Sequence, residues 1–110
     1  MKPDIKRFEQ LQDNFMRDIV AALKNEIRYI ELPEDQKRAL LYALTFNVLS
    51  TIDGAALKEP DGTVVETRLH FYPLAQHESE IHDPIGHDGG TYMHECMPTE
   101  EDTLFDPNSD

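Results

Sequence analysis

Two consecutive helical segments constrain the fold of this chain more than any other feature of its sequence. In residues 4–30, apolar side chains recur in steps of three and four, which places them on one stripe of a helix. The stripe consists of Ile5, Phe8, Leu11, Phe15, Ile19, Ala22, Leu23, Ile27 and Ile30. Pro33 interrupts the pattern and suits the start of a second helix, which we predict from about residue 34 to 52.

The second helix is apolar over more than one face, because its apolar residues do not fall on a single stripe. We therefore expect it at the centre of the fold, between the first helix and either a sheet or a second subunit. Gly54 follows it and can adopt the left-handed conformation that ends many helices.

The hydrophobic period changes from helical to alternating after Gly54. Residues 63–72 alternate as a half-buried strand does, with Val65, Thr67, Leu69 and Phe71 on the side that we expect to face the core. Residues 55–58 would pair with this strand across a turn that contains Pro60 and Gly62, which gives an antiparallel hairpin over about 55–72.

Residues 75–92 contain no sustained apolar period and read as a long loop. A possible further strand follows at 91–97, where apolar and polar residues alternate weakly. Residues 98–102 would then cap a helical turn that seats Leu104 and Phe105. These elements predict an α+β fold, in which two antiparallel amphipathic helices pack on a small antiparallel sheet.

The length of 110 residues fits a single domain, 1–110, with a helical part at 1–53 and a strand and acidic-loop part at 54–110. A single cysteine excludes an internal disulfide framework, and the N-terminus has no signal-peptide core. No apolar run approaches the roughly 18 residues that a membrane span needs. We therefore expect a cytoplasmic protein that does not enter a membrane.

The distribution of charge is uneven. The net charge is −12, and all ten basic side chains lie in residues 1–68, together with twelve acidic ones. Residues 69–110 contain ten acidic side chains and no lysine or arginine. Direct nucleic-acid binding is disfavoured, because that affinity comes mainly from basic side chains that neutralise phosphates. An acidic half suits a basic protein partner, a divalent cation or simple solubility.

The segment 77–96 holds four of the five histidines and the only cysteine, which makes it the candidate metal site. Its potential ligands are His82, His87, His94 and Cys96, and zinc is the ion that suits imidazole and thiolate donors best. The spacing argues against a prepared site, because an offset of five residues separates side chains on a helix and on a strand. Only His94 and Cys96 would share a face, if 91–97 is a strand.

Three other interpretations of this segment remain open. A polar loop with incidental histidines is the simplest. A pH response is another, because acidic neighbours favour the imidazolium form of histidine. A cysteine nucleophile with a histidine base is the third, although no orienting residue or oxyanion hole can be assigned to it.

Two classes of function follow from these observations. The first is a non-enzymatic protein-interaction domain that binds a basic partner, as an inhibitor or an immunity-like protein does. The second is a metal-binding protein that uses the segment 77–96. We expect no catalytic residues and no bound organic cofactor, and a homodimer is compatible with either function because of the apolar second helix.

Overall fold

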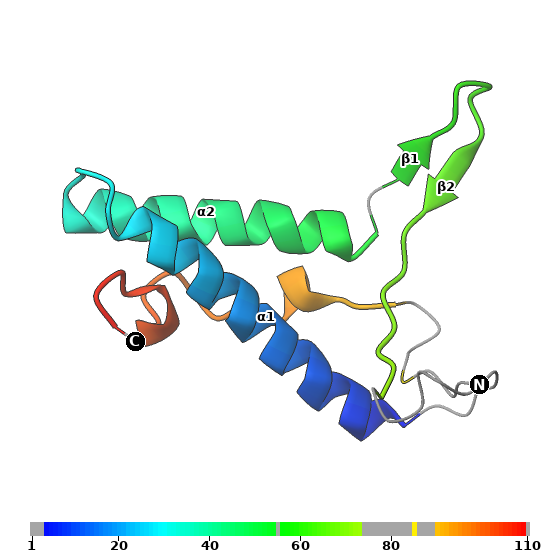
Figure 1. The fold of residues 1–110 in the computed structure, drawn as a ribbon, viewed down its shortest axis with the longest axis horizontal. Helices are drawn as coiled ribbons and strands as arrows, with labels where there is room; N and C mark the ends of the chain where they lie inside the picture. Colours follow the sequence, from blue (N-terminus) through cyan, green and yellow to red (C-terminus); the bar gives the residue numbers. More distant parts are fainter. Residues whose placement is uncertain (1–3, 55, 74–84, 86–89, 110) are drawn as a thin grey trace.

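A computed structural model of the chain describes residues 4–54, 56–73, 85 and 90–109. Its first element is the helix α1 (Ile5–Ile27), which Asp4 caps by accepting a hydrogen bond from the backbone N–H of Arg7. The second is α2 (Glu34–Ile52), which starts directly after Pro33. The two helices run antiparallel and spread apart toward the N-terminus of α1 (Figure 1). The predicted bounds of the second helix are confirmed, and the first is shorter than the predicted 4–30.

The antiparallel hairpin consists of β1 (Ala56–Lys58) and β2 (Val64–Glu66), with Leu57 opposite Val65. It extends beyond the end of α2 (Figure 1). Gly62 has a φ of 92° in the connecting turn, a conformation that favours glycine. The α+β class and the hairpin are thus confirmed.

The predicted strand over 63–72 is correct only in part. Its regular section ends at Glu66, and Val65, expected in the core, is 40% exposed. Phe71 does reach the helices, because its ring packs against those of Phe8 and Phe15. Phe71 also exchanges two backbone hydrogen bonds with Ile85. Most of the predicted loop 75–92 lies outside the described residues.

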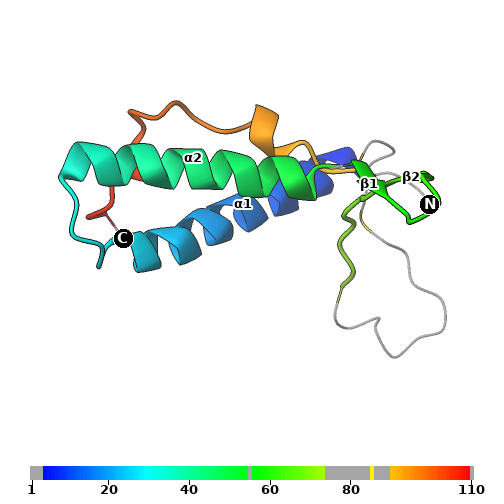
Figure 2. The same ribbon diagram turned by 90° about the horizontal axis from the view of Figure 1, so that it is seen from above.

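The segment 90–109 lies along one face of the helical pair (Figure 2) and completes its core. It contains two short 3-10 turns, η2 (Met93–Glu95) and η3 (Thr103–Phe105). Phe105 packs with Val20, Ile27 and Leu41, and a second cluster joins three further residues, Met16, Leu49 and Met93. The predicted turn that seats Leu104 and Phe105 is confirmed, since Asp102 caps it and Phe105 is fully buried.

The predicted strand at 91–97 is wrong, because η2 occupies its centre. Its backbone donors bind side chains of the helices rather than a neighbouring strand. The N–H of Tyr92 donates to Gln12 Oε1 at 2.6 Å, and the N–H of His94 donates to Asp53 Oδ2 at 2.7 Å. The side chains of Gln12 and Asp53 thus accept hydrogen bonds that the carbonyl groups of a neighbouring strand would accept in a sheet.

The buried side of α1 is also shifted by about one residue from the predicted stripe. Its buried side chains are Phe8, Gln12, Met16, Val20, Lys24 and Ile27. Ile5 and Ile30, which the stripe includes, are 49% and 42% exposed. On α2, one face is buried, whereas Leu44 and Phe46 stay partly exposed. Within the described part of the chain, no helix is long and apolar enough to cross a membrane.

Candidate functional site

The η2 turn and the two residues before it form the part of the molecule where polar side chains from distant segments meet. This turn packs against α1 and α2 on one face of the helical pair (Figure 2) and buries Met93 completely. Its anchors are Gln12, in the middle of α1, and Asp53, at the C-terminal end of α2. The turn therefore has two sides with different chemistry, one toward the end of α2 and one toward α1.

On the α2 side, a buried carboxylate holds a histidine. His94 Nδ1 lies 2.5 Å from Asp53 Oδ2, and the side chain of Asp53 is 3% exposed while that of His94 is 31% exposed. The edge of the Phe46 ring faces the imidazole at 5.9 Å between centroids. Burial on its own would raise the pKa of Asp53, but the hydrogen bonds from the backbone and the ring of His94 outweigh it and lower that pKa below its ordinary value.

The Asp53 contact fixes the orientation of the imidazole. It occupies Nδ1, so Nε2 is the nitrogen left for other contacts, and it lies 3.9 Å from Glu95 Oε1. A carboxylate behind Nδ1 is the arrangement that orients metal-binding and proton-transferring histidines. The same Asp53 oxygen also accepts the backbone N–H of His94, so Asp53 links the C-terminal end of α2 to η2.

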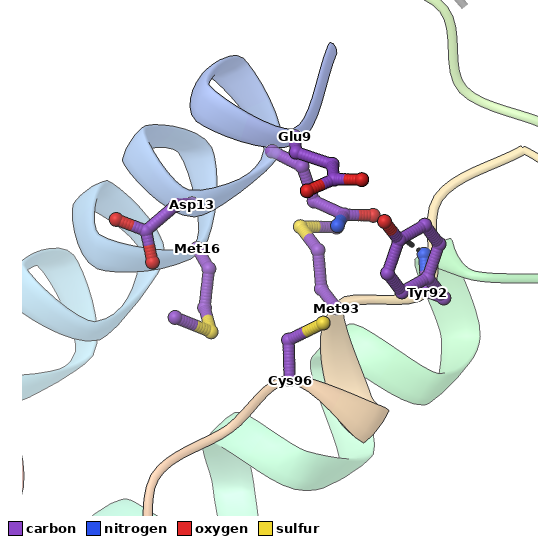
Figure 3. Close-up of a pocket in the computed structure, with 7 residues that line it drawn as sticks. Glu9, Asp13, Met16, Tyr92, Met93 and Cys96 are labelled. Atoms are coloured by element: carbon purple, nitrogen blue, oxygen red, sulfur yellow. Dashed lines mark hydrogen bonds between the residues drawn. The ribbon is translucent and has the colours of Figure 1, made fainter. Parts of the chain in front are cut away.

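On the α1 side, the turn borders a cavity of about 150 Å³ (Figure 3). The cavity is lined by Glu9, Gln12, Asp13, Met16, Tyr92, Met93 and Cys96. The two carboxylates come from successive turns of α1, where residues four apart share a face. The two methionines are buried and form an apolar interior.

The protonation of two groups in this cavity follows from their surroundings. Burial raises the pKa of Tyr92, and the negative charge of Glu9 raises it further. Burial also raises the pKa of the Cys96 thiol, together with the charges of Glu95 and Asp53. Both groups are therefore neutral at physiological pH, and the thiol is not activated as a nucleophile.

The structure separates His94 and Cys96, the two predicted metal ligands that it describes. His94 contacts Asp53 on the α2 side, whereas Cys96 lines the cavity on the α1 side. Their expected common face depended on a strand that does not form. His82 and His87 lie outside the described residues. Within the residues that are described, no group of three or more His, Cys, Asp or Glu side chains is placed to hold a metal ion.

Sequence reasoning did not identify Asp53 and Gln12 as site residues. Asp53 lies 41 residues from its partner His94, and Gln12 lies 80 residues from Tyr92. Gln12 lies next to the predicted apolar stripe rather than on it, so no local signal marks it as buried. Comparisons of this chain with protein-family models, with curated proteins and with solved structures found no match.

Proposed function

We propose that this chain is a non-enzymatic protein-interaction domain that binds a basic partner, in the manner of an inhibitor or an immunity-like protein. The net charge of −12 supports this function, because an acidic surface speeds encounter with a basic partner and disfavours acidic ones. The absence of lysine and arginine after Arg68 concentrates that charge in one part of the sequence.

The observation that carries the proposal is the set of hydrogen bonds that four basic side chains, on the helices or directly after them, donate. Arg38 donates to the carbonyl oxygens of Glu100 and Asp102, and Arg28 donates to two further carbonyls, those of Pro107 and Ser109. Lys37 donates to the carbonyl of Arg28, and Lys24 donates to the hydroxyl of Ser109.

Each of these hydrogen bonds ends on an uncharged oxygen. Arg38, Arg28 and Lys24 thus attach the segment 100–109 through its backbone and through the Ser109 hydroxyl, while the residues Glu101 and Asp102 are exposed. An exposed carboxylate on a segment that is fixed in place is available to a basic partner at little cost in conformational entropy.

Binding measurements with a purified partner test the function. Proteins captured on the immobilised chain at about 20 mM salt are purified, and each is titrated with the chain by calorimetry. We expect a basic partner whose affinity falls by roughly tenfold or more between about 50 and about 300 mM sodium chloride. A purified partner whose affinity does not respond to salt, or one that is acidic, would contradict the proposal.

Metal binding is the second candidate function, and the Asp53–His94 pair favours it. A buried carboxylate on Nδ1 orients the imidazole and leaves Nε2 for another ligand, as the outer partners of metal-binding histidines do. Of the predicted ligands His82, His87, His94 and Cys96, Cys96 lies on the other side of η2 from His94, so His94 would hold zinc with His82 and His87. Elemental analysis of the protein purified without a histidine tag tests this, and less than near-stoichiometric metal would rule it out.

A homodimer and a cytoplasmic location complete the proposal. The exposed Leu44 and Phe46 on α2 support self-association through that helix. Light scattering of the purified chain measures its mass directly, and a monomeric mass at all concentrations would exclude the dimer. The single cysteine supports a reducing compartment.

A further inference from the structure

We propose that the cavity between α1 and η2 receives one lysine or arginine side chain of the basic partner. This inference rests on the proposed interaction function and adds the place and the chemistry of the central contact. The cavity is lined by residues of α1 and of the segment 92–96, which are far apart in the sequence (Figure 3).

The size of the cavity fits a side chain. A cavity of about 150 Å³ is large enough for one benzene-sized group. The four-carbon stem of lysine with its ammonium group has a similar number of heavy atoms. A second copy of a helix or a folded loop would not enter such a space, so the site holds one inserted side chain.

The lining of the cavity fits the two chemical parts of such a side chain. Met16 and Met93 are almost fully buried and supply apolar contacts for the alkyl stem. Glu9 and Asp13 are exposed and lie on the α1 side, with Tyr92 and Cys96 across from them (Figure 3). Lysine and arginine combine an apolar stem with a charged end, which matches an apolar interior with an acidic rim.

The electrostatics of the rim favour a cation over an anion or a neutral group. Glu9 and Asp13 are four residues apart on α1, and like charges at this spacing repel each other. Asp13 already accepts from Arg17 at 2.9 Å, but both side chains of this ion pair are at least half exposed, and such pairs contribute little stability. An incoming cation can therefore bind Asp13 together with Arg17 and reduce the repulsion between Asp13 and Glu9.

The neutral groups of the lining act in the same direction. Burial first, and the negative charges nearby second, raise the pKa values of Tyr92 and Cys96. The carboxylates of Glu9 and Asp13 line the same cavity, and their negative charge attracts an ammonium or guanidinium group. The face of an aromatic ring such as Tyr92 adds a further attraction for cations.

Methyl NMR of the full chain labelled with [methyl-13C]methionine tests the inference directly. The probe is the blocked peptide acetyl-Ala-Ala-Lys-Ala-Ala-amide, and the matched peptides carry norleucine or glutamate in place of lysine. We expect the lysine peptide to shift the methyl signals of Met16 and Met93 in a saturable manner and to shift that of Met97 much less. Equal shifts with the norleucine peptide, or none with the lysine peptide, would overturn the inference.

A pair of double variants tests the role of the rim. We expect Glu9→Gln with Asp13→Asn to weaken binding of the lysine peptide about tenfold, since two exposed charge contacts are lost. The matched control is Asp18→Asn with Glu26→Gln, which removes two exposed carboxylates of the same helix away from the cavity and should leave the affinity unchanged. Far-ultraviolet circular dichroism of both double variants verifies that the helices are retained.

The outcomes separate this inference from the proposed function. If a purified basic partner binds the parent chain and the Glu9→Gln, Asp13→Asn variant equally, the cavity is not the contact, although the function stands. If the lysine peptide shifts the methionine signals while no basic protein binds, the cavity has the proposed chemistry and the function fails. Free spermidine that binds at least as tightly as the peptide would overturn the assignment to a protein side chain.

Discussion

Asp53 connects the end of α2 to the segment that follows the hairpin. Its carboxylate is almost completely buried and accepts from both the backbone and the ring of His94. A buried carboxylate is costly unless it accepts hydrogen bonds, and here Oδ2 accepts two of them from His94. The position of η2 against the helices therefore depends on the charge of one residue.

The substitution Asp53→Asn tests this dependence. Asparagine has nearly the same shape but lacks the charge, so we expect a loss of about 1–3 kcal/mol in the free energy of unfolding. Urea denaturation followed by circular dichroism measures it. The control is Asp61→Asn, because Asp61 also accepts a backbone N–H, that of Thr63, but is fully exposed. Equal stability of Asp53→Asn and the parent chain would show that the buried charge is not needed.

The pH dependence of stability provides a second measurement on the same residue. Because hydrogen bonds lower the pKa of Asp53 in the folded state, its contribution is present above the unfolded value of about 4 and is lost as the pH falls through the folded value. The stability difference between the parent chain and Asp53→Asn should thus be full at neutral pH and shrink below about pH 4. A difference that grows toward acid pH would contradict this assignment.

At the scale of elements, the segment 90–109 covers one face of the helical pair, as a sheet does in a simpler α+β fold. Two turns from this segment, η2 and η3, supply Met93 and Phe105 to the core between the helices. Phe105 also packs edge to face on Tyr42, with 5.0 Å between ring centroids. The core of the helical pair therefore includes side chains from outside the two helices.

Truncating the Phe105 side chain tests how much this residue contributes to the core. We expect Phe105→Ala to lower the free energy of unfolding by about 3–5 kcal/mol, because it leaves a cavity in the core. Phe105→Leu keeps much of the volume and should cost less than about 2 kcal/mol, so it remains measurable if the alanine variant does not fold. Leu57→Ala on the exposed β1 strand is the control and should cost under about 0.5 kcal/mol. Similar losses at both positions would contradict the proposed core.

The elements differ in how far the sequence predicts them. Pro33 and Gly54 are local signals, and they predict the bounds of α2 correctly. The buried side of α1 is harder, because Gln12 and Lys24 become buried only through partners at Tyr92 and Ser109. No local pattern marks such partners.

The same reason limits prediction of the site. The weak alternation at 91–97 predicts a strand if the backbone N–H groups of this segment are assumed to bind the carbonyl groups of a neighbouring strand. The acceptors are instead side chains of the two helices, which the chain brings together only on folding. The histidine-rich segment includes His94, but Asp53, the residue that positions its ring, carries no motif.

At the scale of the whole molecule, repulsion among like charges opposes the folded state. The net charge is −12, and the basic side chains of Arg28 and Arg38 donate to backbone carbonyl oxygens of the segment 100–109. Added salt should therefore weaken the repulsion more than it weakens these attachments.

We expect the urea midpoint of the parent chain to rise when sodium chloride increases from about 20 to about 300 mM, because charges further apart than a Debye length become screened. Potassium chloride at the same concentrations is the control and should give the same rise, since screening does not depend on the identity of the cation. A midpoint that falls with salt would show that attractive ion pairs dominate the electrostatics of the chain.

The dependence of the helical pair on Phe105 and Met93 has a consequence for how the protein is made. During translation, α1 and α2 leave the ribosome before the residues that cover them, because η2 and η3 come last in the sequence. The apolar side of the nascent helices stays uncovered for that interval, and such surfaces are what chaperones bind. The core of the helical pair is therefore complete only after Phe105 has been synthesised.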